Sequence, residues 1–238
     1  MAFYEDFAKV YDQVMDQELY DQWFDFSVRH FGASTRKILE LACGSGALSA
    51  RFESADFDVT GLDISPEMLE LAKKKAPSVH FLQGDMRALD FDNEFDAVTC
   101  YSDSLCYLAN LAEVRETFDG VHRALKSGGI FIFDVHSTHQ VDDIFPGYSY
   151  HENAEDYAFL WDSYAGEAPH SIEHDLTFFI KGGNGQFTRK DELHAERTYA
   201  LTDYLAQLAD FSEIEIYADF SDREPDEESK RWFFVCRK

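Results

Sequence analysis

Residues 37–46 read Lys-Ile-Leu-Glu-Leu-Ala-Cys-Gly-Ser-Gly, and this stretch decides the fold. Its first part, Lys37–Ala42, is a short apolar run typical of a buried strand. Gly44 and Gly46 follow at once and allow the backbone to turn tightly and approach a ligand, before a helix that we predict over Ala47–Ser54. A strand, a glycine-rich turn and a helix in this order predict a ligand-binding loop.

The same alternation of strand and helix continues as far as residue 135. Helices are expected to begin after Ser65, with Pro66 in the first turn, and after Asn110, the latter ending at Gly128-Gly129. Such a rhythm predicts an α/β fold with a doubly wound parallel sheet, which binds ligands at the carboxyl ends of its strands. The further strands are expected over Phe57–Leu62, Val79–Leu82, Phe95–Tyr101 and Ile130–Val135.

The rhythm breaks after Ser137, where we predict an antiparallel β insertion over residues 140–199 that covers the substrate. Gly182–Gly185 has the composition of a hairpin turn inside it. We therefore divide the chain into an aromatic N-terminal helical segment (1–33, two helices), a core (34–139 and 200–238) and the insertion. The expected strands of the insertion are Tyr157–Tyr164, Ser171–Ile180 and Phe187–Tyr199, and the chain returns with a helix over Leu201–Ala209 and strands over Glu213–Tyr217 and Trp232–Arg237.

Composition limits the partners of the chain. The net charge is −25 over 238 residues, so nucleic acid and anionic membrane surfaces are unfavourable partners. The first residues lack the pattern of a signal peptide, and the four cysteines lack CxxC spacing, so we expect a reduced, cytoplasmic protein. Hydrophobic residues make up 45% of the chain and aromatic residues 16%, enough for a core and an aromatic pocket. Nothing in the sequence predicts the oligomeric state.

Carboxylates stand at the ends of three successive strands. Glu40 precedes the glycine loop, where it would repel a pyrophosphate but attract the ammonium group of S-adenosylmethionine. Asp63 can accept hydrogen bonds from the ribose hydroxyls, or it competes with Ser65 for the helix cap. Asp85 can accept from the adenine amine while Met86 packs on the ring, or Asp85 is only a turn residue.

Four motifs, Glu40–Gly46, Gly61–Ser65, Gly84–Met86 and Phe95–Val98, together resemble the class I S-adenosylmethionine-dependent methyltransferases. The resemblance implies S-adenosylmethionine as cofactor and a seven-stranded Rossmann-like sheet whose last strand is antiparallel. Ala42-Cys43 stands where that family usually has Gly-x. The opening Tyr4–Asp12 is similar to a helical lid of a small bacterial subgroup, in which Tyr11 would contact the methionine carboxylate. The remaining cofactor contacts implied are Ala42, Cys43, Gly44, Gly46, Ile64 and Tyr101.

The segment Tyr101–Leu108 looks like the substrate-facing loop of that family. It lacks the Pro-Pro-Tyr pattern of DNA and protein-glutamine methylators, which favours a small-molecule acceptor. Polar groups that could take a proton from the acceptor are Asp103, His136 and His194, our candidate catalytic residues. A metal site of His174, Glu192 and His194 is conceivable but not expected. Candidate substrate contacts are Ser104, Tyr107, Trp161, His174 and Glu192.

The hypothesis is therefore a methyltransferase that moves the methyl group of S-adenosylmethionine to a small molecule by in-line displacement. An NAD-dependent oxidoreductase is the alternative enzyme, although the third glycine of the dinucleotide fingerprint is missing and Glu40 is unfavourable for it. A non-catalytic module that binds S-adenosylmethionine is the other alternative.

Overall fold

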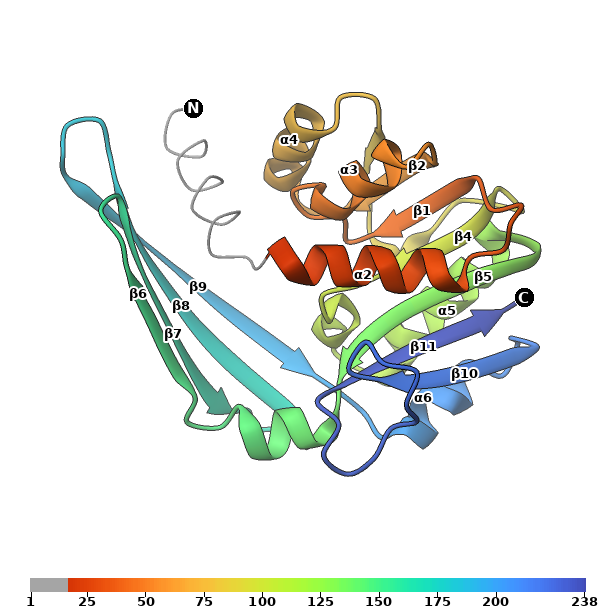
Figure 1. Ribbon diagram of the computed structural model, residues 1–238. Helices are drawn as coiled ribbons and strands as arrows, with labels where there is room; N and C mark the ends of the chain where they lie inside the picture. The colour runs from red at the N-terminus through yellow and green to blue at the C-terminus, as the bar shows by residue number, and fades with distance from the viewer. Residues whose placement is uncertain (1–16) are drawn as a thin grey trace.

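A twisted central sheet organises the chain, which the computed structural model describes over residues 17–238 (Figure 1). Its strand order is β10-β11-β5-β4-β1-β2-β3. Strand β11 pairs antiparallel with both β5 and β10, whereas the pairs among β1 to β5 are parallel. The doubly wound sheet with an antiparallel last strand is thus confirmed. The strands are β1 (Lys37–Leu41), β2 (Asp58–Asp63), β3 (His80–Gln83), β4 (Phe95–Cys100), β5 (Leu125–His136), β10 (Glu213–Ala218) and β11 (Arg231–Arg237).

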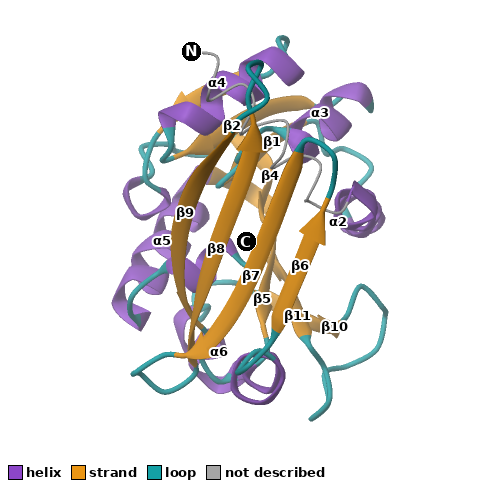
Figure 2. Ribbon diagram, turned by 90° about the vertical axis from the view of Figure 1, so that its left-hand side faces the viewer, coloured by secondary structure: helices purple, strands orange, loops and turns teal. Residues whose placement is uncertain are grey.

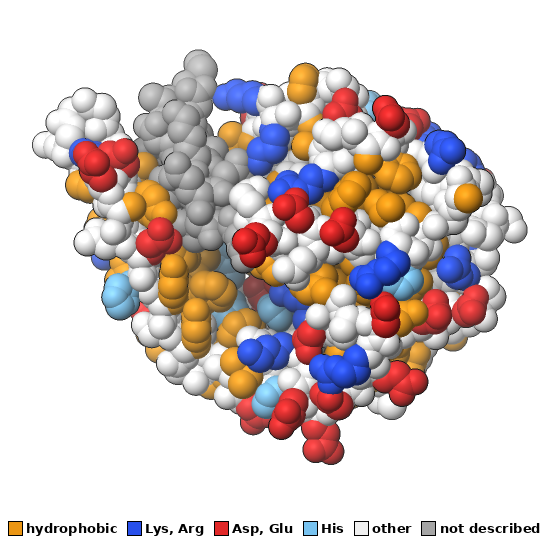
Figure 3. All heavy atoms as spheres, viewed as in Figure 1, with side chains coloured by type: hydrophobic (Ala, Val, Ile, Leu, Met, Phe, Trp, Pro, Cys, Tyr) orange, Lys and Arg blue, Asp and Glu red, His pale blue; other side chains and the backbone are white. Residues whose placement is uncertain are grey.

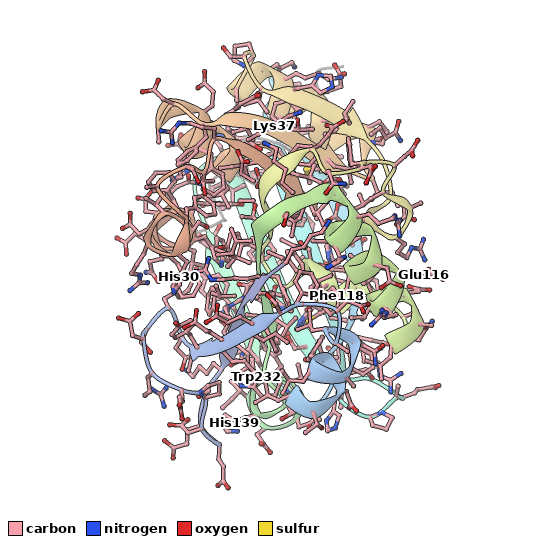
Figure 4. The ribbon with its side chains drawn as sticks, turned by 90° about the vertical axis from the view of Figure 1, so that its right-hand side faces the viewer. His30, Lys37, Glu116, Phe118, His139 and Trp232 are labelled. Atoms are coloured by element: carbon pink, nitrogen blue, oxygen red, sulfur yellow. The ribbon has the colours of Figure 1, made fainter. Side chains whose placement is uncertain are left out.

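Helices cover both faces of this sheet because its buried strands are apolar on both sides. Phe131 and Phe133 face a core with Phe118 of α5, whereas Ile130 and Ile132 face the opposite core with α2, α3 and α4. Figure 4 shows Phe118 between α5 and the sheet, with Glu116 on the outer side of the same helix. The helices are α2 (Gln17–His30), α3 (Ala47–Ser54), α4 (Pro66–Lys75), α5 (Leu111–Ala124) and α6 (Leu201–Gln207).

The helix starts follow the expected capping chemistry. The hydroxyl of Ser65 accepts the N–H of Met68 at 3.2 Å, with Pro66 in the first turn of α4. The side chain of Asn110 accepts the N–H of Glu113 at 3.1 Å, and the Glu113 carboxylate accepts the N–H of Ala109 at 3.1 Å. These caps satisfy N–H groups that an α-helix leaves without an intrahelical partner.

The predicted boundary at Gly128-Gly129 is wrong. Helix α5 ends at Ala124, and both glycines lie within β5, next to an irregularity in its pairing with β4 between Phe95 and Ala97. Gly128 has a φ of +74°, and its N–H donates to the carbonyl of Lys238. The glycine pair therefore shapes an irregular strand beside the chain end rather than ending a helix.

The predicted antiparallel insertion is a four-stranded sheet in the order β6-β7-β8-β9, which we call the cap sheet (Figure 2). A short helical turn over Gln140–Ile144 leads into it from β5. The sequence did not reveal β6, whose five residues are mostly polar and exposed. The strands are β6 (Ser149–Asn153), β7 (Tyr157–Ala165), β8 (Ser171–Lys181) and β9 (Phe187–Arg197).

Alternation along the cap strands separates two faces. Ser163, His174 and His194 occupy matching positions on β7, β8 and β9, and His194 contacts the core through Tyr107. The same face carries Glu192 and Glu196 at neighbouring even positions of β9, as a period of two requires. The opposite face exposes Leu160, Tyr164 and Leu193. The cap sheet thus turns a polar and aromatic face toward the core.

Candidate active site

A cavity of about 420 Å³ opens at the carboxyl ends of β1, β2 and β4, a size usual for small-molecule sites. The structure brings the predicted cofactor residues together there, except Gly46, which does not line it, and Tyr11, which lies outside the described residues. Tyr20 and Trp23 of α2 complete one wall. The predicted residues that line the cavity are Glu40, Ala42, Cys43, Gly44, Asp63, Ile64, Asp85, Met86 and Tyr101.

The loop after β1 needs its glycines for two different reasons. Ala42, Gly44 and Gly46 all have positive φ angles, at 51°, 53° and 74°. A Cβ at Gly44 would meet nothing within 4 Å, so this part of the backbone is open toward the cavity. A Cβ at Gly46 would lie 2.9 Å from the Cβ of Ala72 in α4. Gly44 therefore permits approach to a ligand, whereas Gly46 permits close helix packing.

Glu40 is a buried carboxylate without an ion-pair partner among the described residues, and it accepts a hydrogen bond from Ser49. Burial raises the pKa of Glu40 to about 8, the Ser49 hydrogen bond lowers it, and the nearby Asp63 raises it further. Because Glu40 also lines the cavity, a positively charged group bound there would favour its ionised form. The residue fits the ammonium group expected from the sequence.

Asp63 holds the loop in place. One of its oxygens accepts the N–H of Gly44 at 2.7 Å, and the other accepts the N–H of Ser65 at 2.8 Å. The side chain of Ser65 is nevertheless the one that caps α4, so Asp63 does not displace it. Asp63 still lines the cavity, and its contact with a ribose stays a prediction.

Asp85 is paired more strongly than the sequence suggested. Its carboxylate binds the guanidinium of Arg87, with Oδ2 to Nη2 at 2.6 Å, and accepts the N–H of Arg87 at 2.9 Å. This hydrogen bonding with Arg87 outweighs burial and lowers the pKa of Asp85. Arg87 also lines the cavity, and no sequence signal marked it. The predicted contact of Asp85 with adenine remains untested.

A chain of hydrogen bonds crosses from the cavity to the cap sheet. Tyr107 lines the cavity, and its hydroxyl lies 2.7 Å from Nδ1 of His194. The other ring nitrogen of His194 lies 3.2 Å from Glu192, which also pairs with Lys190 at 2.6 Å. Ser104 lines the cavity as well, and its hydroxyl donates to the carbonyl of Tyr101. The sequence analysis expected Tyr107, Glu192 and His194 at the site, but it did not predict the hydrogen bonds that connect them.

A second polar group joins the core to the cap sheet. Nε2 of His136, at the end of β5, lies 3.2 Å from Oδ2 of Asp103 and 3.7 Å from Oε2 of Glu196 on β9. Asp103 sits in a left-handed backbone conformation, with φ of 51°, in the loop after β4. Burial, followed by the charge of Asp103, raises the pKa of Glu196 to about 7. Two predicted catalytic residues, Asp103 and His136, thus meet in this group together with Glu196.

Arg231 of β11 supports this group from the sheet. It pairs with Asp103 and with Asp134, its Nη1 lying 2.6 Å from Oδ2 of Asp134, and the indole of Trp23 donates to Asp134 at 2.8 Å. Burial would raise the pKa of Asp103, but Arg231 and His136 outweigh it and lower this pKa. Burial raises the pKa of Asp134 despite Arg231. Sequence reasoning missed Arg231 because one arginine in an apolar strand carries no pattern.

A smaller cavity of about 300 Å³ lies beside His136 and Arg231, with Trp161 on its cap side. The indole of Trp161 donates to Nδ1 of His174 at 3.1 Å, and Ser163 lies 2.7 Å from the same nitrogen. Burial lowers the pKa of His174 to about 4, which keeps this imidazole neutral. In Figure 3, hydrophobic side chains gather on the cap beside the core, with histidines at the junction. His174 is therefore a buried support of Trp161.

Comparisons with known proteins agree with this geometry. Residues 38–129 match the family model described as a methyltransferase domain. Putative methyltransferases of Geobacillus sp. (strain WCH70) and Bacillus subtilis (strain 168) are each 41% identical, covering 99% of this chain and 99% and 97% of theirs. The crystal structure of an S-adenosylmethionine-dependent methyltransferase from Clostridium acetobutylicum superposes with a TM-score of 0.83 at 24% identity, over 98% of both chains.

Within residues 17–238, the structure contains no helix with the length and apolar character of a membrane span. Family membership also sets aside the NAD-dependent oxidoreductase. The cavity at the strand ends and the matches along the whole chain agree, and this protein belongs to the class I S-adenosylmethionine-dependent methyltransferases.

Proposed function

We propose that the protein methylates a small amine that binds between the cofactor cavity and the cap sheet. The position of Tyr107 carries this proposal. Its ring lines the cavity, while its hydroxyl binds His194 of the cap at 2.7 Å. One residue thus belongs to both the donor site and the expected acceptor site.

The cavity residues would bind and orient the cofactor. In this proposal Glu40 pairs with the ammonium group, Asp63 with the ribose, and Ile64 and Met86 flank the adenine; all four line the cavity. The cofactor supplies a methyl group already activated on a sulfonium. The protein therefore gains rate mainly by holding donor and acceptor in line and by excluding water.

An amine acceptor fits the groups on the cap side. Amines are largely protonated near neutral pH, so the nucleophile must lose a proton before it attacks. Tyr107, His194 and Glu192 form a hydrogen-bonded chain that leads away from the cavity and can carry that proton. A glycine/sarcosine N-methyltransferase of Parasynechococcus marenigrum, 33% identical over 142 residues, supports an amine acceptor; the match covers 56% of this chain and 50% of that protein.

The test is a screen of small amines, alcohols and thiols with methyl-labelled S-adenosylmethionine, read as labelled product and S-adenosylhomocysteine. We expect turnover with amines, and a loss of kcat in His194→Gln at unchanged affinity for S-adenosylhomocysteine. His80→Ala, an exposed histidine on β3, is the matched control and should behave like the wild type. Turnover confined to alcohols or thiols would refute the amine. Cofactor binding without any turnover would favour the non-catalytic module.

A further inference from the structure

Three side chains from separate elements converge where the cap sheet meets the core. They are Asp103 in the loop after β4, His136 at the end of β5 and Glu196 on β9. One ligand-type atom of each lies within 4.8 Å of the other two. Glu196 also accepts a hydrogen bond from Tyr107, so these three residues adjoin the Tyr107–His194–Glu192 chain. Asp103 and His136 are not members of that chain, and with Glu196 they form a second polar cluster.

The spacing of these atoms suits a bound metal ion. Zinc-type ions bind imidazole nitrogen and carboxylate oxygen at about 2.0–2.2 Å, so tetrahedral ligand atoms lie roughly 3.4 Å apart. Nε2 of His136 is 3.2 Å from Asp103 and 3.7 Å from Glu196, on either side of that value. The 3.7 Å separation is too long for a direct hydrogen bond but short enough for two ligands of one ion.

An unpartnered oxygen is a second, independent observation that favours a cation site. Oε2 of Glu196 has no hydrogen-bond partner, and the Glu196 side chain is 6% exposed. Burying a carboxylate in this way is costly unless a positive charge compensates it. Oε2 is also the atom that faces His136. A cation between the two would satisfy it.

When its carboxylates are ionised, the cluster carries more negative than positive charge. Asp103, Asp134 and Glu196 bring three carboxylates, and Arg231 brings one guanidinium. Arg231 contacts Oδ1 of Asp103, which leaves Oδ2 directed at His136. With all groups ionised and the imidazole neutral, two negative charges are in excess. One divalent ion would cancel them.

We propose that Asp103, His136 and Glu196 bind one divalent transition-metal ion that ties the cap sheet to the core. An imidazole with two carboxylates suits ions such as Zn²⁺, Mn²⁺ and Co²⁺, whereas Ca²⁺ prefers oxygen ligands throughout. The cavity beside His136 provides an entry path. The ligand set differs from the His174, Glu192 and His194 considered from the sequence, since Nδ1 of His174 is already engaged by Trp161 and Ser163.

The experiment uses the full chain after treatment with a chelator. Co²⁺ titration followed by visible absorption should show one ion per chain, and Zn²⁺ should displace it. Glu196→Gln keeps the shape of the side chain and should weaken Zn²⁺ binding in calorimetry by at least about a hundredfold, as should His136→Ala. Zn²⁺ should also raise the Tm of the wild type by several degrees, and not that of Glu196→Gln.

The matched control is His151→Ala, which removes an exposed histidine of the cap sheet outside the cluster and should bind Zn²⁺ like the wild type. S-adenosylhomocysteine binding checks that each variant is folded. Absence of saturable binding in the wild type would overturn the proposal, as would binding that survives both Glu196→Gln and His136→Ala. In either case a proton, and not a metal ion, compensates the cluster.

Discussion

Replacement of Glu40 by Gln tests whether ionisation of this buried carboxylate lowers the stability of the fold. Burial raises the pKa of Glu40 from 4.5 to about 8, and one pKa unit corresponds to about 1.4 kcal/mol. Because the folded pKa is raised, the wild type has its full stability below about pH 4.5 and loses stability as the pH rises toward 8. That loss is roughly 5 kcal/mol in total.

Glu40→Gln has no carboxylate to ionise, and its amide oxygen can still accept from Ser49. We therefore expect its free energy of unfolding at pH 8 to exceed that of the wild type by a few kcal/mol, with little difference at pH 5. Urea unfolding at both pH values measures this. Asp58→Asn, an exposed carboxylate at the start of β2, is the control and should show no such gain.

Ligand binding should show the opposite effect. An ammonium group needs the ionised form of Glu40, so below pH 8 binding must release a proton. The affinity of the wild type for S-adenosylhomocysteine should rise nearly tenfold between about pH 6 and 7 and more slowly toward pH 8, with close to one proton released at pH 6.5 by calorimetry in different buffers. Glu40→Gln should bind more weakly at pH 8, with a flat profile. A flat profile in the wild type, or no gain in stability for Glu40→Gln, would refute the reasoning.

The remaining predictions concern the loop after β1 and the side of the site that faces the cap sheet. Gly46→Ala should lower the free energy of unfolding by about 1–3 kcal/mol in urea, because its Cβ would lie 2.9 Å from that of Ala72 at a φ of +74°. Gly44→Ala, which meets no neighbour within 4 Å, should cost less stability and instead weaken S-adenosylhomocysteine binding in calorimetry. Tyr107→Phe should lower kcat at unchanged cofactor affinity, and an unchanged kcat would argue against the proton path. Trp161→Ala should raise the KM of the acceptor more than that of the cofactor in steady-state kinetics.

Local patterns were sufficient to predict most of the fold. Most core strands contain a short apolar run, and caps such as Ser65 act within a few residues of the helix they begin. The errors arose where distant contacts decide the outcome. Gly128-Gly129 lies inside β5 because Lys238, over a hundred residues away in sequence, hydrogen-bonds to it. Strand β6 was missed because it is mostly polar and is held by its pairing with β7.

The cofactor side of the site was predictable because parallel strands end at one edge of the sheet. Glu40, Asp63 and Asp85 could therefore be placed together from their positions after successive strands. The pairing of charges could not be predicted. Arg231 reaches Asp103 and Asp134 from a strand about a hundred residues further along the chain, a contact that sequence spacing does not encode. The role of Gly46 likewise depends on the approach of α4.

Buried carboxylates distinguish structural sites from binding sites in this protein. Asp134 is matched by Arg231 and by the indole of Trp23. Asp63 has no Lys or Arg partner either, but each of its oxygens accepts a backbone N–H. Glu40 and Glu196 have neither a Lys or Arg partner nor such a backbone N–H in the described part of the chain. Evolution rarely keeps an uncompensated buried charge without a use for it, because a neutral residue would be more stable. The ammonium group that we expect at Glu40 and the metal ion that we propose at Glu196 would meet the same physical requirement, a cation beside a buried carboxylate.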